Sequence, residues 1–87
     1  MNFALVNPEV AHQYTVLSLQ KAIIKLDTCI QNLQEVQQLN PNNVRFGQMI
    51  SIIRDEREKI QAELTAIQTA HASDNNITAN HLDPGFQ

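Results

Sequence analysis

Apolar residues recur at steps of three and four along most of the chain, which is the pattern of helices that bury one side. In the first half these positions are Val16, Leu19, Ile23, Leu26, Ile30 and Leu33. In the second half they are Phe46, Ile50, Ile53, Ile60, Leu64 and Ile67. We call these twelve positions the seam. The pattern predicts two long helices that pack on each other along the seam.

An Asn-Pro pair precedes each predicted helix. Asn7 suits a helix cap, Pro8 suits the first helical turn, and Glu9 suits the positive end of the helix dipole. The next proline is Pro41, in the asparagine-rich segment 40–43, which is typical of a turn. We therefore expect an all-α antiparallel helical hairpin over residues 8–72, with helices at about 8–38 and 44–70.

Both ends of the chain depart from this pattern. Residues 1–7 begin with the apolar run MNFALV, and we expect an N-terminal arm that either packs on a neighbour or frays. From Ser73 the sequence SDNNITANHLDPGFQ is polar and aperiodic, which predicts a flexible C-terminal tail over residues 73–87. The alternative is that Ile77, Leu82 and Phe86 anchor this tail on a partner.

Four residues near the seam are not explained by apolar packing between the helices. Arg57 falls on the seam itself, so we expect it to pair with an acid or to extend to solvent. Cys29 is expected to be a buried, inert thiol, and His12 to have a structural role. Gly47 either admits another backbone closely or marks a frayed first turn.

Further apolar residues lie away from the seam: Val10, Leu17, Ile24 and Val36, then Met49 and Ile52. A hairpin of 87 residues buries little surface, and its single cysteine and scattered histidines offer neither a disulfide nor a metal to stabilise it. We therefore expect a homo-oligomeric helical bundle, most simply a dimer of four helices. A helical partner protein would cover the same faces.

Charge and motifs exclude several functions. A net charge of −3 argues against a DNA-binding protein, and the sequence has neither a signal peptide nor an apolar run long enough for a membrane span. We therefore expect a cytoplasmic protein. No sequence motif of a hydrolase, phosphate loop, zinc site or dinucleotide site is present, so we expect no enzyme, no metal and no cofactor.

One polar group suggests a ligand. On a helical wheel, Tyr14, Lys21, Lys25 and Thr28 share a stripe opposite the seam, beside Val10, Leu17 and Ile24. An anion between the two lysines would relieve their repulsion, and the tyrosine ring could stack on a base. The alternative is a solvated lysine face with one exposed tyrosine. In an oligomer, Arg45 and Arg54 could join the group.

The segment PEVAHQYT at 8–15, followed by a long helix, a proline turn and a second helix, resembles small phage anti-CBASS proteins. That family consists of helical oligomers that sequester cyclic oligonucleotide signals. The resemblance implies that Tyr14 with Lys21 or Lys25 contacts a cyclic di- or trinucleotide. The sequence lacks the His-Pro-Pro stretch of some family members. The helix order is also similar to that of the helical-hairpin chaperones of secretion systems.

Two hypotheses on function follow. The first is a non-catalytic oligomer that sequesters cyclic nucleotides in counter-defence, with Tyr14, Lys21, Lys25 and Thr28 as ligand-binding residues. The second is a protein-binding adaptor or small helical chaperone without a small-molecule ligand. Its docking face would comprise Val10, Leu17, Ile24, Met49 and Ile52.

Overall fold

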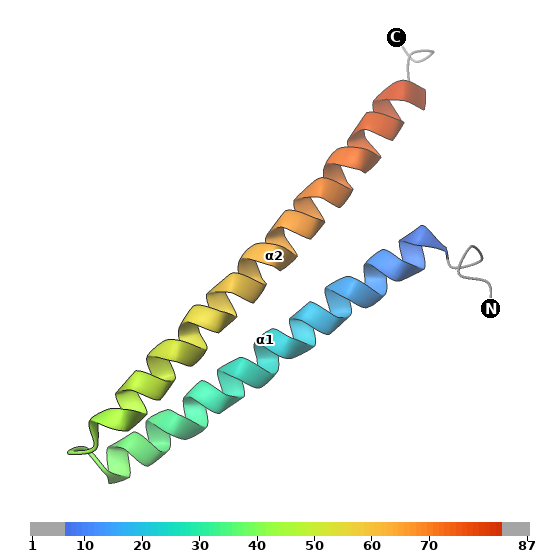
Figure 1. The fold of residues 1–87 in the computed structure, drawn as a ribbon. Coiled ribbons are helices and arrows are strands. Elements are labelled where there is room, and N and C mark those ends of the chain that lie inside the picture. The colour runs from blue at the N-terminus through green and yellow to red at the C-terminus, as the bar shows by residue number, and fades with distance from the viewer. Residues whose placement is uncertain (1–6, 83–87) are drawn as a thin grey trace.

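The computed structural model describes residues 7–82, with side chains described up to Asp74. It contains two helices, α1 (Pro8–Leu39) and α2 (Val44–Leu82), joined by a short turn (Figure 1). The helices run antiparallel, are closest near the turn and separate toward their other ends (Figure 1). The predicted all-α antiparallel hairpin is confirmed. With a shortest dimension of 14 Å, the molecule is one layer of helices thick.

Asparagines define both helix starts and the turn. The side-chain oxygen of Asn7 accepts a hydrogen bond from the Glu9 backbone N–H at 2.8 Å. Asn43 does the same for Arg45 at 3.0 Å, so both helices begin at a cap of the same kind. At the end of α1, the backbone N–H of Asn40 bonds to the Gln37 carbonyl at 3.1 Å. These local bonds fix where the chain reverses.

The seam forms the contact between the two helices. Ile23 and Ile30 of α1 and Ile50 and Leu64 of α2 are its most buried residues, and Ile50 is only 4% exposed. The other eight predicted seam residues are half-buried. Hydrophobic burial along this line stabilises the hairpin, as the spacing predicts. However, none of the residues with described side chains is fully buried, because two helices cannot surround a side chain.

Two expectations differ from the structure. Helix α2 continues to Leu82, twelve residues past its expected end near 70, so much of the segment expected as a tail is helical. No proline or glycine interrupts the chain between Gly47 and Pro84, and this accounts for the extension. Cys29 is exposed, and the prediction of a buried thiol is wrong. Its position lies about a quarter-turn from the centre of the seam, on the flank of α1.

Some expectations concern residues outside the described part of the chain. The apolar arm at 1–6 and the end of the expected tail at 83–87 are among them. So are the side chains of Ile77, Leu82 and Phe86, which were expected as alternative anchors.

Arg57 forms the principal polar contact across the seam. Its Nε lies 2.6 Å from Asp27 Oδ1, and its Nη2 donates to Asp27 Oδ2 at 3.3 Å. The hydrogen bond to Asp27 is the main cause that raises the pKa of Arg57 above its ordinary value, and partial desolvation opposes it. Arg57 is therefore paired, one of its two expected outcomes. The partner on α1 was not predicted.

A second polar contact joins the helices far from the turn. The rings of His12 and His71 stack with their centroids 3.7 Å apart and their planes inclined by 13°. Glu9 Oε2 lies 3.3 Å from Nε2 of His71 on the same side of the hairpin. His12 thus faces α2, in agreement with its predicted structural role. Together with Arg57 and Asp27, this contact fixes the register of the two helices.

Candidate functional site

The side of α1 that faces away from α2 carries a regular row of exposed residues. We call this row the α1 outer stripe, and it comprises Val10, Tyr14, Leu17, Lys21, Ile24 and Thr28. Its steps alternate between four and three residues, which is the spacing of a helix seam. The stripe therefore has the geometry of a packing surface, although nothing in the hairpin covers it.

Among the described residues, nothing covers the apolar members of this stripe. Ile24 is 63% exposed, whereas its neighbour Ile23 is 7% exposed. Val10 and Leu17 are each a little under half exposed. Val10, Leu17 and Tyr14 also line a shallow depression together with Gln13. Apolar residues grouped in this way typically mark an interaction site.

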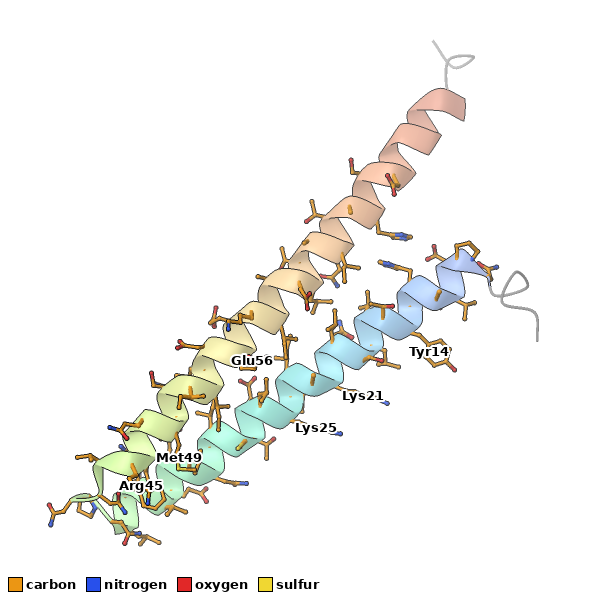
Figure 2. The ribbon with its side chains drawn as sticks, viewed as in Figure 1. Tyr14, Lys21, Lys25, Arg45, Met49 and Glu56 are labelled. Atoms are coloured by element: carbon orange, nitrogen blue, oxygen red, sulfur yellow. The ribbon has the colours of Figure 1, made fainter. Side chains whose placement is uncertain are left out.

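The predicted ligand-binding residues all lie on or beside the stripe. Figure 2 shows Tyr14, Lys21 and Lys25 along α1 with their side chains directed away from α2. Tyr14 is 68% exposed, so its ring is available for stacking. The Thr28 hydroxyl donates to the Ile24 carbonyl at 3.0 Å, an intrahelical bond that leaves its oxygen able to accept. The structure thus brings the four residues to one side of one helix, but it encloses none of them.

Helix α2 has an exposed row with the same spacing on its flank, about a quarter-turn from its seam. This α2 outer stripe comprises Arg45, Met49, Ile52, Glu56, Lys59 and Glu63, and its steps also alternate between four and three. Ile52 is 68% exposed and Met49 is 44% exposed. Arg45, Met49 and Glu56 are labelled along this helix in Figure 2. Unlike the α1 stripe, this one carries two carboxylates, which are balanced by Arg45 and Lys59.

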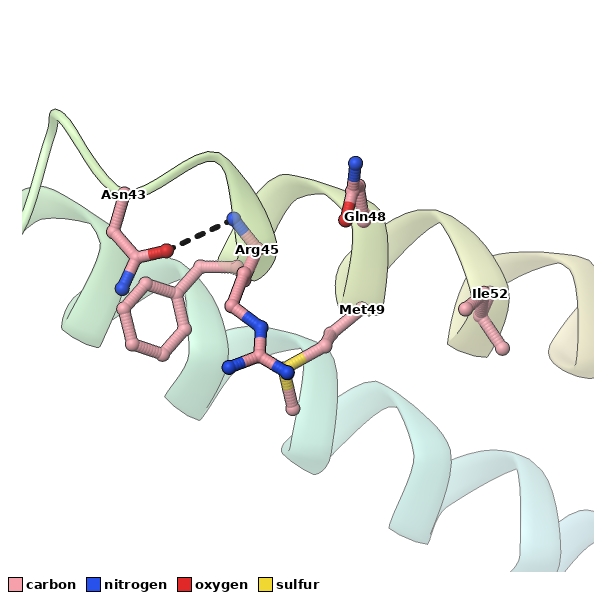
Figure 3. A pocket seen from close by; sticks show the side chains of 6 residues that line it. Asn43, Arg45, Gln48, Met49 and Ile52 are labelled. Carbon is pink, nitrogen blue, oxygen red and sulfur yellow. Dashed lines mark hydrogen bonds between the residues drawn. The ribbon is translucent and has the colours of Figure 1, made fainter.

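The turn end of the molecule holds a groove that sequence reasoning did not identify. Figure 3 shows its lining residues at the start of α2: Asn43, Arg45, Phe46, Gln48, Met49 and Ile52. The large apolar residues Leu39 and Val44 are exposed nearby, on the two sides of the turn. Arg45 therefore belongs to this groove and not to the group around Tyr14 within one chain. The sequence signal for this site was the presence of two apolar residues, Met49 and Ile52, away from the seam.

The His, Cys, Asp and Glu side chains of the described residues are dispersed along the hairpin. Among them, no group of three or more His, Cys, Asp or Glu side chains could hold a metal ion. The stacked histidines are already engaged with each other and with Glu9. Within the same residues, neither helix is long and apolar enough to cross a membrane. What the surface offers is therefore apolar area bordered by charge.

Comparison with known proteins adds no further assignment. No family model, no curated protein and no solved structure matches this chain.

Proposed function

We propose that this chain is a non-catalytic helical protein that self-assembles and sequesters a cyclic nucleotide beside the α1 outer stripe. The observation that carries the proposal is that this stripe combines helix-seam spacing with exposed side chains at all six positions. An apolar seam without a partner favours association, and an aromatic-cationic border favours a nucleotide. In phage counter-defence, such a protein would act by lowering the concentration of a free signal.

The argument for assembly rests on burial. Val10, Leu17 and Ile24 are exposed at every second position of the α1 outer stripe, with Tyr14 and Lys21 between them. Burying one such side chain completely stabilises a protein by roughly 1.5–3 kcal/mol, so the three together offer a substantial gain. Closed homo-oligomers are the commonest way to realise such a gain. The hairpin also needs this added stabilisation, since its own seam buries little apolar surface.

The argument for an anionic ligand rests on the two lysines. Lys21 and Lys25 are one helical turn apart and exposed on the same side of α1. Like charges at this spacing destabilise a helix by a few tenths of a kcal/mol, and a bound phosphate would reverse that effect. Tyr14 lies two turns before Lys21 and supplies a ring on which a base could stack. The resemblance to anti-CBASS proteins implies the same residues and a cyclic di- or trinucleotide.

Calorimetric titration with a panel of cyclic di- and trinucleotides tests the ligand. We expect binding to the wild-type protein and a loss of at least about tenfold in affinity for Lys25→Glu, because a phosphate contact becomes a repulsion. Lys59→Glu is the matched control, since it changes the charge equally at an exposed position of α2 that is not among the candidate ligand-binding residues. Absence of binding across the panel by an intact assembly would reject the ligand.

A second candidate function is a protein-binding adaptor or small chaperone. It is favoured by the groove at the turn end, where Leu39 and Val44 are among the most exposed large apolar residues. An adaptor would leave apolar surface open after assembly, whereas a nucleotide-binding oligomer would cover it. Light scattering combined with binding of a hydrophobic dye separates the two, because only the adaptor predicts strong dye binding by a stable oligomer.

A further inference from the structure

The row of seam residues ends in two histidines at the end of the hairpin away from the turn, which we call the open end. On α1, His12 precedes the seam residue Val16 by four residues, and on α2, His71 follows the seam residue Ile67 by four. Both histidines are half-buried, as are Val16 and Ile67. The stacked imidazole rings therefore occupy the position where the next apolar layer of the seam would lie.

The histidine pair joins the helices where they have separated. Helices α1 and α2 diverge from the turn toward the open end (Figure 1). Leu64 is the last buried residue on the α2 side of the seam, and Val16 and Ile67 beyond it keep part of their surface in water. Because little apolar burial holds this end, the contact of His12 with His71 has a larger share in closing it than it would have near the turn.

The charge of the open end depends on the protons that this pair holds. All six lysine and arginine residues of the chain lie between positions 21 and 59, so none is near the pair in sequence. The carboxylates around the pair are Glu9 on α1 and Asp74 on α2, with Glu63 about two turns before His71. Among the described residues at this end, positive charge therefore comes from protonated histidine.

The stacked arrangement accommodates one proton better than two. A proton on His71 gives the Glu9 carboxylate, 3.3 Å away, a charged partner, so the first proton strengthens the contact. A second proton would place two positive rings with their centroids 3.7 Å apart. Like charges at this separation repel, and the carboxylate of Glu9 lies against only one of the two rings in the printed contacts. The doubly protonated stack is therefore unfavourable.

We propose that the His12–His71 pair is a pH-sensitive latch, which holds the open end of the hairpin together at neutral pH and releases it in mild acid. Histidine is the side chain whose charge changes between about pH 5 and 8. Separated histidines bind two protons and the stacked pair binds one, so a fall in pH favours separation. With an ordinary histidine pKa of about 6.5, the additional proton favours separation by up to roughly 30-fold at pH 5. The inference goes beyond the proposed function and depends on neither its ligand nor its assembly.

Release of the latch alters the surface beside the candidate ligand-binding residues. A shallow depression next to the pair is lined by both histidines and, among others, by Val16, Leu17 and Gln68. Separation of the two helices widens this depression and adds its apolar wall to the exposed surface. Leu17 is also a member of the α1 outer stripe, so the latch connects pH to the apolar surface of that stripe.

Distances between pairs of spin labels test the latch. Labels at Ala11→Cys and Ala72→Cys report on the open end, and labels at Asn32→Cys and Ser51→Cys report on the half near the turn. All four positions are exposed, and Cys29→Ser removes the exposed native thiol. Double electron–electron resonance is measured at about pH 8 and about pH 5, between which imidazoles gain their charge while carboxylates stay largely ionised. We expect the open-end distance to lengthen at pH 5 and the distance near the turn to stay the same.

Two variants assign the response to the pair. His12→Phe combined with His71→Phe keeps two stacking rings without a titrating nitrogen, so its open-end distance should not depend on pH. His81 is unchanged in this variant, which controls for the third histidine of the chain. Glu9→Gln removes the carboxylate that accommodates the first proton, so separation should begin at a higher pH than in the wild type. A purely structural role of Glu9 would instead lengthen the distance equally at both pH values.

The outcomes that would overturn the latch are distinct. An open-end distance in the wild type that is the same at pH 5 and pH 8 would show that the pair stays closed. An equal response by the phenylalanine variant would show that another group titrates. Lengthening of the distance near the turn to the same extent would show that acid loosens the whole hairpin and not its open end. Each of these results leaves the proposed ligand and self-assembly to their own tests.

Discussion

Two adjacent isoleucines on α1 show how differently its two sides are used. Ile23 lies on the seam and is 7% exposed, whereas Ile24 points away from α2 and is 63% exposed. Both belong to rows of residues with the spacing of a helix seam. The difference is that, among the described residues, the row of Ile23 packs on α2, whereas the row of Ile24 packs on no other helix. An apolar row without a partner is therefore the clearest indication of what this surface is for.

The comparison extends to the polar residues of each side. On the inner side, the charge of Arg57 is matched by Asp27 at 2.6 Å. On the outer side, Lys21 and Glu56 lie exposed on different helices, and neither is paired among the described residues. A charge on a packing surface is tolerated when an opposite charge faces it. The inner charge meets this condition within the chain, whereas the described residues supply no opposite charge beside Lys21 or Glu56.

The largest expected effect comes from placing a charge on each side in turn. Ile23→Asp should unfold the hairpin at room temperature, because it buries a carboxylate without a partner in the seam. Ile24→Asp should keep the helical signal, since the new carboxylate is in water. Thermal melts followed by circular dichroism measure both. If the two variants melt alike, the difference between the two sides is not as the structure describes it.

A smaller effect is expected at the polar contact across the seam. Asp27→Asn should lower the melting temperature, because Arg57 keeps its half-buried position but loses its charged partner. Arg57→Leu should raise the melting temperature or leave it unchanged, because it completes the apolar row between Ile53 and Ile60. Calorimetric melts of the two variants compare them directly. An increase in stability for Asp27→Asn would show that the contact does not stabilise the hairpin.

The raised pKa of Arg57 makes a further prediction about pH. A group whose pKa is raised on folding contributes its full stability below its pKa in the unfolded chain and loses it only above that value. For an arginine that window lies above about pH 12, so protonation of Arg57 itself should not change stability from neutral to mildly alkaline pH. The difference in melting temperature between wild type and Arg57→Leu should therefore be the same at about pH 7 and pH 9. A difference that changed between those values would indicate another titrating group.

The smallest expected effect concerns Gly47 on the inner side. A Cβ atom at this position would lie 3.4 Å from Nε2 of Gln37, an ordinary contact with the far end of a flexible side chain. Gly47→Ala should therefore stabilise the hairpin by about 0.5–1 kcal/mol through helix propensity. Chemical unfolding measures this change. A destabilised variant would show that another backbone approaches Gly47 closely in the assembly.

Sequence periodicity alone was sufficient to predict which residues lie between the two helices. Step sizes of three and four identified all four buried residues, and asparagine and proline located the first helix and the turn. The end of α2 was placed too early, because polar composition was given more weight than the absence of a helix-breaking residue. Cys29 was misplaced because a position one residue from Ile30 lies well to the side of a helix seam.

Contacts between residues distant in sequence could not be predicted in the same way. The pairing of Arg57 with Asp27 and the stacking of His12 on His71 depend on the register of the two helices. Periodicity predicts which side of a helix a residue occupies, but it does not predict which residue of the other helix lies opposite it. The same limit applies to Tyr14, Lys21, Lys25 and Thr28, whose common side was predictable and whose ligand was not.

The central claim is that the exposed row on α1 is an assembly surface, and the mass of the protein in solution tests it most directly. Sedimentation equilibrium should give a mass several times that of one 9.8 kDa chain for the wild type. Under the same conditions, Ile24→Asp should give the mass of a single chain while retaining its helical content. A wild-type protein that remains monomeric over the concentration range and still melts cooperatively would contradict the claim.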